Sequence, residues 1–182
     1  MSIRSLLLVG AIVLLGTTAP SLSAAEGPER FLGSFVGQTL SAASDEVSPR
    51  DITVKIEPGE RDNEFFLEWT LVSVKSSGKI KRKQYRIKFA ETRRDGIYKS
   101  KMRADMFGNQ VPLDPLKGEP FVWAKIEGST LTVHTLLITD EGGYEMQTYN
   151  RTVTAEGMEL KFTRVRDDQV MRTVTGKLKK VQ

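Results

Sequence analysis

The chain has 182 residues, no cysteine and a single histidine, His134. The absence of cysteine excludes disulfide bonds, thiolate metal sites, iron–sulfur clusters, cysteine nucleophiles and acylated-cysteine membrane anchors. One histidine cannot build a metal cage that needs several. No Gly-x-Ser-x-Gly motif and no calcium-loop spacing of acids occurs either. The sequence therefore predicts no catalytic residue, no metal and no cofactor, and it leaves a hydrolase or isomerase only as a third hypothesis.

Long apolar runs are scarce as well, since only Leu6–Leu15 is almost unbroken. Arg4 precedes this run, and Ser23, Ala24 and Ala25 end the small and polar stretch that follows it. About ten residues are too few for a spanning helix, which needs about twenty. Small residues at positions −3 and −1 predict a signal peptide over residues 1–25 that is cleaved after Ala25, with an uncleaved N-terminal anchor as the alternative. We predict no spanning segment in the mature chain.

Removing residues 1–25 leaves a predicted domain over residues 26–182, which is about one domain in length. This part holds 26 basic and 23 acidic residues, a formal charge of +3. An exported domain without cysteine depends on its core for stability, because no disulfide can brace it. That combination favours the bacterial periplasm. The composition, 39% hydrophobic and 27% charged, excludes wholesale disorder.

Convincing helical periodicity is missing from the mature chain, and short β-prone segments separated by turn residues take its place. Their spacing of roughly ten residues is typical of an all-β protein. Nine or ten sequential strands most simply close into an up-and-down antiparallel β-barrel, with a two-sheet β-sandwich as the alternative. The predicted strands are Phe31–Leu40, Ile52–Glu57, Phe65–Leu71, Tyr85–Phe89, Ile97–Arg103, Phe121–Glu127, Thr130–Thr139, Tyr144–Val153, Met158–Arg166 and Val170–Val181. Residues 104–119, with two prolines and two glycines, are expected to lack regular structure and to form a loop that lids the barrel mouth or packs on the surface.

Two hairpin registers follow from the pairing of like side chains. In an antiparallel hairpin the numbers of two opposite residues always add up to the same sum. Over residues 64–90 a sum of 154 places Trp69 opposite Tyr85, with two more apolar pairs beside them. A sum of 336 in the last hairpin places Phe162 opposite Val174 and therefore Arg164 opposite Arg172. A sum of 338 would instead bring Arg166 opposite Arg172 at the hairpin tip.

The layout over residues 31–181 resembles the calycin barrels, the lipocalin and fatty-acid-binding-protein group. Gly33-Ser34-Phe35 stands where lipocalins carry Gly-x-Trp, and residues 157–162 and 176–181 are similar to the end of fatty-acid-binding proteins. The aromatic residue is phenylalanine, residues 41–50 are too few for a lid of two helices, and Arg172-Thr173-Val174 lacks the tyrosine of an Arg-x-Tyr clamp. The resemblance implies a barrel with an apolar interior that binds a small molecule, and lipocalins pack a closing arginine on the first-strand aromatic residue.

The candidate ligand site lies around Arg164 and Arg172, because two guanidinium groups on an apolar wall repel unless an anion lies between them. Pairing with acids of the protein, or packing of one arginine on the first-strand aromatic residue, is the alternative. The aromatic residues that could line a ligand cavity, or simply fill a core, are Trp69, Tyr85, Trp123, Tyr144, Tyr149 and Phe162. His134 in its strand is read as a structural residue.

A dense run of basic residues forms a second candidate surface. It could attract anionic lipid or an acidic partner, or it could be a solvated outer face that discourages edge pairing. We expect no nucleic-acid partner, because no aromatic platform is interleaved with the basic residues. The members of this basic strand are Lys79, Lys81, Arg82, Lys83, Arg86 and Lys88.

Two hypotheses for function remain ahead of catalysis. The first is non-enzymatic binding of a small apolar or amphipathic, lipid-like anionic ligand inside the barrel. The second is a structural or interaction module of the cell envelope with a filled barrel, which binds an anionic envelope component or a protein through its outer surface. A connected cavity lined by Trp69, Tyr85 and Arg172 is expected under the first hypothesis and not under the second. The oligomeric state is left open.

Overall fold

The computed structural model describes residues 27–41, 50–74, 77–101, 103–104, 110–111 and 113–181. The predicted signal peptide, residues 1–25, lies outside these ranges. Ten strands form one closed barrel in the order β1-β12-β11-β10-β9-β8-β5-β4-β3-β2, and every neighbouring pair is antiparallel. The prediction of an up-and-down barrel is confirmed, and the sandwich alternative is wrong.

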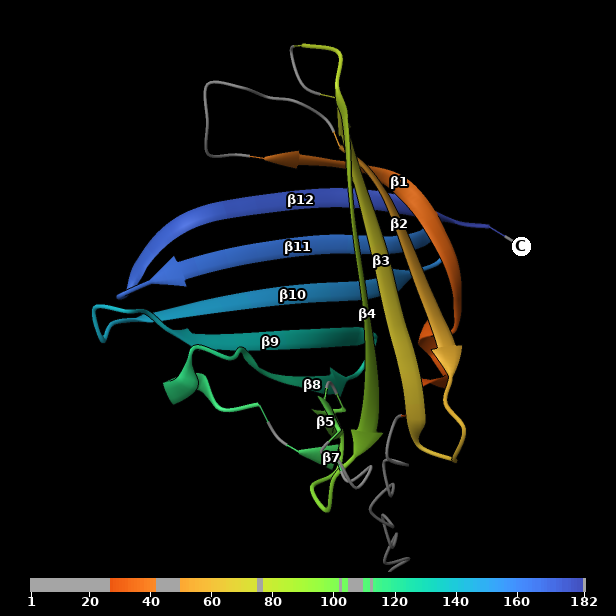
Figure 1. Ribbon diagram of the computed structural model, residues 1–182. Coiled ribbons are helices and arrows are strands. Elements are labelled where there is room, and N and C mark those ends of the chain that lie inside the picture. Colours follow the sequence, from red (N-terminus) through yellow and green to blue (C-terminus); the bar gives the residue numbers. More distant parts are fainter. Residues whose placement is uncertain are drawn as a thin grey trace, which may run out of the picture.

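The barrel strands match the predicted segments closely. In Figure 1 the strands from β9 to β12 run across those from β2 to β4 at a steep angle, and β1 bends from one direction into the other. The strands of the barrel are β1 (Gly33–Ser41), β2 (Arg50–Pro58), β3 (Glu64–Val74), β4 (Ile80–Glu91), β5 (Ile97–Ser100), β8 (Phe121–Glu127), β9 (Thr130–Ile138), β10 (Tyr144–Thr154), β11 (Gly157–Arg166) and β12 (Gln169–Val181).

The connection between β5 and β8 contains more regular structure than the sequence predicts. A two-stranded ladder pairs β6 (Arg103–Ala104) with β7 (Gln110–Val111). A 3-10 turn, η2 (Pro115–Lys117), follows and is capped by the Asp114 carboxylate, which accepts a hydrogen bond from the backbone N–H of Leu116 at 3.0 Å. The expectation of an irregular segment is therefore wrong here, because short hydrogen-bonded elements fit between the prolines and glycines. The predicted strand over 97–103 ends at Ser100.

Both predicted registers are confirmed. Trp69 is opposite Tyr85 in the β3–β4 hairpin, and Phe162 is opposite Val174 in the β11–β12 hairpin. Arg164 is opposite Arg172, and a β-bulge follows immediately between Arg164 and Val165. The turn residues of the last hairpin, Asp167 and Asp168, have φ values of 44° and 65°. Two successive positive φ values suit a tight hairpin turn, whose twist matches that of the flanking strands.

The barrel has one tightly packed half, at the end where β1 begins and β12 ends. A 3-10 turn, η1 (Pro28–Phe31), inserts Phe31 there with none of its surface exposed. Phe65 stacks on Phe89 and meets Tyr98 edge-on, with 5.2 Å between ring centroids in both pairs. We call this the packed half, and the half toward the opposite ends of the strands the open half. Among the described residues no helix is long and apolar enough to cross a membrane.

Candidate functional site

A cavity of about 720 Å³ occupies the open half of the barrel. Trp69, Tyr85 and Arg172 all line it, together with Tyr149 and Phe162. Its volume lies within the range of small-molecule sites, roughly 300–1,000 Å³. The inward positions of the strands are therefore filled by packed side chains in one half of the barrel and border empty space in the other.

Four aromatic residues predicted for the site form a continuous row of ring contacts across the barrel, which we call the aromatic bridge. Tyr85 stacks on Trp69 with 5.0 Å between centroids, Trp69 lies 5.8 Å from Tyr149, and Tyr149 lies 4.7 Å from Phe162. The first pair comes from β3 and β4, and the second from β10 and β11, on the opposite wall. The bridge gives the cavity an aromatic surface between its open end and the packed half.

Arg151 packs against the aromatic bridge and is only 2% exposed. Its guanidinium carbon is 5.2 Å from the ring centroid of Trp69 and 5.7 Å from that of Tyr149. Nε and Nη1 are buried without a hydrogen-bond partner, and no carboxylate among the described residues forms an ion pair with this side chain. Burial lowers the pKa of Arg151 to about 10, although Tyr149 acts in the opposite direction. The group is still charged at neutral pH, and contact with ring faces compensates only part of its lost hydration.

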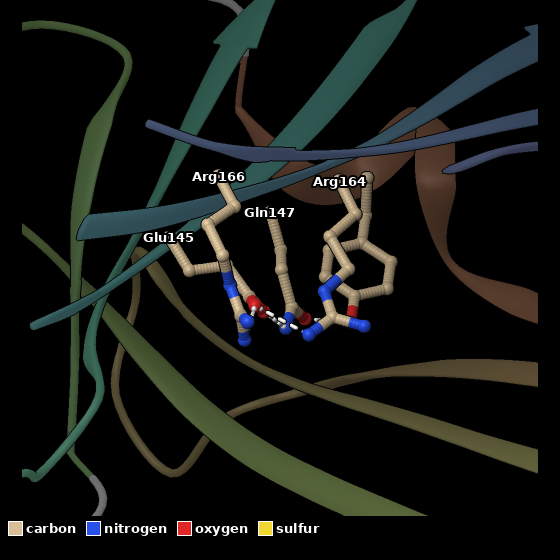
Figure 2. Close-up of polar contacts among 5 residues, drawn as sticks. Glu145, Gln147, Arg164 and Arg166 are labelled. Atoms are coloured by element: carbon tan, nitrogen blue, oxygen red, sulfur yellow. Dashed lines mark hydrogen bonds and ion pairs between the residues drawn. The ribbon is translucent and has the colours of Figure 1, made fainter. Parts of the chain in front are cut away.

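Arg164 is paired with an acid of the protein itself (Figure 2). Its Nη2 donates to Oε2 of Glu145, and Nη2 of Arg166 donates to the same oxygen at 3.2 Å. Gln147 donates to the other carboxylate oxygen at 2.6 Å and accepts from the Tyr149 hydroxyl at 2.7 Å. Burial raises the pKa of Glu145, but the hydrogen bonds from Arg164 and Gln147 outweigh it and hold the pKa below its ordinary value. For Arg164 the alternative of pairing with a protein acid is therefore the observed arrangement.

Arg172 has no such acid among the residues that the structure describes. Its Nε donates to the hydroxyl of Ser41 at 3.2 Å, and no ion pair joins it to a described carboxylate. Burial lowers the pKa of Arg172, and the nearby cations Arg50 and Arg164 lower it further. Arg50 opens β2 and also lines the cavity. Two arginines thus stand together at the mouth of the barrel without an acidic partner among the described residues.

The basic strand is divided by the alternation of β4. Lys81 and Lys83 lie on the same side as Tyr85 and line the cavity mouth. Arg86 and Lys88 lie on the outer face, where Arg86 is 3.4 Å from Glu68 and Lys88 is 2.9 Å from Glu60 and 3.0 Å from Glu64. Lys79 and Arg82 are exposed. The six residues therefore do not form one surface.

Two aromatic residues expected in the cavity lie on the outer face instead. Trp123 stacks on His134 with 4.8 Å between centroids, and the hydroxyl of Tyr144 donates to Asp168 at 2.5 Å. Trp123 shares its parity on β8 with exposed Phe121, while Val122 and Ala124 point inward. The expectation that Trp123 and Tyr144 line the cavity is wrong, because strand parity places both outside. Burial lowers the pKa of His134, and the positive charge of Lys125 lowers it further, which agrees with a structural role.

The cavity lining is strongly one-sided in charge. Of its 24 described residues six are basic and none is Asp or Glu. Strand alternation points Lys161 outward, and the other five lie at inward positions. The basic lining residues are Arg50, Lys81, Lys83, Arg151, Lys161 and Arg172. No group of three or more histidine or acidic residues that could hold a metal occurs in the described part of the chain.

Sequence reasoning missed Arg151 and Arg50, although strand parity marks both. Arg151 is two residues from Tyr149 on β10, and Arg50 is two residues from Ile52 on β2. The lipocalin-like expectation of an arginine on the first-strand aromatic residue is also corrected. Lys180 is the cation there, with its Nζ 5.8 Å from the ring centroid of Phe35.

Comparison with known proteins adds no relative. No protein family model matches this chain, and no curated protein matches it.

Proposed function

We propose that this protein binds a small amphipathic anion inside the open half of its barrel and carries out no reaction on it. The ligand's apolar part would lie against the aromatic bridge and the aliphatic lining residues. Its acidic group would contact a guanidinium of the cavity. Basic side chains at the mouth would attract it and guide its entry.

Arg151 is the observation that carries this proposal. A fully buried guanidinium without an acidic partner is costly, and such groups are normally paired in proteins. Here the neighbouring space is a cavity lined by other cations and by no described acid. A carboxylate, sulfate or phosphate ester in this cavity would balance the charge of Arg151, and arginine is a preferred residue for binding such anions.

The closed ten-strand barrel supports the same conclusion by architecture, since calycin barrels enclose small apolar molecules. We infer kinship with that group from the layout, from Phe35 buried at the start of the barrel, and from the cation packed on it. This kinship is a proposal about ancestry, and the binding proposal stands on the cavity residues without it.

The alternative, a filled barrel that acts through its outer surface, has less support. The open half contains a cavity of about 720 Å³. On this alternative the basic strand would be the contact surface for an anionic partner. Two of its lysines line the cavity instead, and two of its cations are paired with acids of the outer face. We therefore propose that an anionic envelope component supplies the ligand inside the barrel. We favour this over an anionic partner bound to the outer wall.

We propose in addition that the chain is exported to the periplasm after cleavage behind Ala25. The Leu6–Leu15 run and the small residues before position 26 support this. The mass of the protein purified from its own host tests it, since cleavage predicts a chain that begins at Glu26. An intact N-terminus would contradict the cleavage.

Native mass spectrometry of the purified protein and a titration with dodecanoate test the binding proposal. Trp69 lines the cavity and reports occupancy through its fluorescence. We expect saturable binding of dodecanoate, and binding of dodecanol roughly tenfold weaker, because the alcohol cannot form a charge-assisted hydrogen bond with Arg151. A lipid-sized adduct in the mass spectrum would identify the natural ligand class.

Two variants make this titration specific. Arg151→Met should bind both compounds with similar affinity, while Arg82→Gln, which removes an exposed charge from the same barrel, should behave like the wild type. If neither compound binds and no adduct is seen, the binding proposal fails. If Arg151→Met keeps the preference for the acid, the anchor is wrongly assigned.

A further inference from the structure

The cavity holds unpaired guanidinium groups at two different depths. Arg151 packs against the aromatic bridge, while Arg172 and Arg50 lie at the mouth. All three line the same cavity, and none forms an ion pair with a described carboxylate. A ligand with a single acidic group can satisfy only one of these two positions.

The strand register sets the separation of the two positions. Arg151 is opposite Leu160 on β11, and Leu160 is opposite Gly176 on β12. Arg172 lies four residues further along β12 toward the mouth. At about 3.3 Å per residue this places Arg172 about 13 Å from the level of Arg151 along the strand direction.

The surface between the two positions is apolar. Phe162 is opposite Val174. Two residues along each strand in one direction lies the pair of Leu160 and Gly176, and two residues in the other direction lies the pair of Arg164 and Arg172. Since Glu145 already pairs with Arg164, Arg172 and Arg50 are the arginines of the mouth without an acidic partner among the described residues. The order along the wall is therefore cation, apolar surface, cation.

We propose that the ligand is an elongated amphiphile with an acidic group at each end, bound with one end at Arg151 and the other at Arg172 and Arg50. This inference rests on the proposed function, because it assumes that an amphipathic anion enters the cavity. It adds the ligand class, a chain with two acidic ends of the dicarboxylate type, and it fixes the orientation along the barrel axis.

Comparison of dodecanedioate, dodecanoate and dodecanol by the Trp69 fluorescence titration tests this inference. The extended chain of dodecanedioate has about the length that separates the two positions. A second carboxylate weakens binding wherever it is stripped of water without a partner, and strengthens binding where a cation receives it. Whether dodecanedioate binds more tightly or more weakly than dodecanoate thus reports whether the mouth position is a binding site. We expect dodecanedioate to bind roughly tenfold more tightly than dodecanoate.

Three variants assign the two ends. Arg172→Met should remove the advantage of the diacid and leave the affinity for dodecanoate within about twofold, whereas Arg151→Met should weaken both acids. Arg82→Gln is the matched control, because it removes one positive charge from the outer face. Far-UV circular dichroism and thermal unfolding of each variant establish that it is folded, and Arg172→Gln provides a second neutral form if Arg172→Met is not folded.

Each result has a definite meaning. If dodecanoate binds and the diacid binds no more tightly, the two-ended ligand is overturned and the proposed function stands. If the diacid keeps its advantage in Arg172→Met, or in Arg172→Gln where Arg172→Met does not fold, the mouth assignment is overturned. If neither acid binds, both proposals fall together.

Discussion

The two halves of the barrel share their ten strands and their strict alternation, yet their interiors differ. In the packed half Phe65 and Phe89 fill inward positions and Phe31 of η1 joins the same core, all with 0% exposure. In the open half the corresponding positions carry Arg151, basic mouth residues and partly exposed aromatic rings around a cavity. The same backbone pattern thus supports a stabilising core at one end and a cavity at the other.

This difference indicates where the free energy of unfolding originates. Aromatic contacts in the packed half remove apolar surface from water, at roughly 25 cal/mol per Å². The open half forgoes part of that gain and adds the cost of a buried, unpaired charge. Stability and the proposed binding therefore belong to different halves, and substitutions should separate them.

The largest expected effect is in the packed half. Phe65→Ala removes a ring that stacks on Phe89 and meets Tyr98, so it should lower the free energy of unfolding by about 3–5 kcal/mol. Leu71→Ala on the same strand borders the cavity and should cost only about 1 kcal/mol. Urea denaturation measures both. Equal losses in the two variants would contradict the division into halves.

A substitution in the open half should have the opposite sign. Arg151→Met replaces an unpaired buried guanidinium by an apolar side chain of similar length, so the free energy of unfolding should rise by about 1–2 kcal/mol. Chemical denaturation of the ligand-free protein measures this change. A clear loss of stability would show that the ring contacts with Trp69 and Tyr149 outweigh the cost of burial.

Acid should weaken the packed half through Glu64. The hydrogen bond from Lys101 is the largest influence on the pKa of Glu64 and lowers it. Burial raises this pKa, and the hydrogen bond from Lys88 lowers it again, so that it falls to about 2 from its ordinary value of 4.5. The folded pKa lies below the unfolded value. The stabilisation is therefore present above about pH 4.5 and is lost as the pH falls toward 2.

Glu64→Gln should lower the free energy of unfolding at pH 7 by on the order of 1 kcal/mol, because solvent screens ion pairs near the surface. It should also reduce the fall in stability between about pH 5 and pH 2. Urea midpoints across this range measure both effects. Glu159→Gln removes an exposed partner of Lys177 and is the control, with a change within about 0.5 kcal/mol. An unchanged acid profile in Glu64→Gln would remove Glu64 from this account.

The smallest expected effect concerns the rate of entry into the open half. The double substitution Lys81→Gln and Lys83→Gln should slow ligand association about threefold at low salt and have little effect at high salt, because screening removes the attraction. The matched control removes Lys177 and Lys179, two lysines of equal charge on the outer face of β12. Stopped-flow fluorescence measures the rates, and equal slowing in both pairs would show that only net charge matters.

The sequence predicts the fold well because two-residue alternation is a local signal. Trp69 and Tyr85 could be paired by number alone, and the same arithmetic placed Arg164 opposite Arg172. The ladder of β6 and β7 was missed, because it depends on pairing within a connection whose turn residues argue against regular structure. Closure of β1 onto β12 followed only from the general tendency of such sheets to remove their edges.

The site was predicted only in part, because its chemistry depends on contacts between distant strands. The two predicted arginines are neighbours, but Glu145 on β10 pairs with Arg164, and no sequence pattern announces that contact. Arg151 shares parity with Tyr149 and could have been placed inside the barrel. Its lack of an acidic partner could not have been known, since that property belongs to the whole surrounding wall.

The alternation of β4 has a consequence for how this chain tolerates insertions and deletions. Odd-numbered residues such as Lys83 and Tyr85 serve the chamber, and even-numbered ones such as Arg86 serve the outer wall. A slip of one residue would exchange the two sets all along the strand. Changes of length in the β3–β4 turn are therefore acceptable only when the turn absorbs them, and comparison of turn lengths among related chains should show variation confined to the tip.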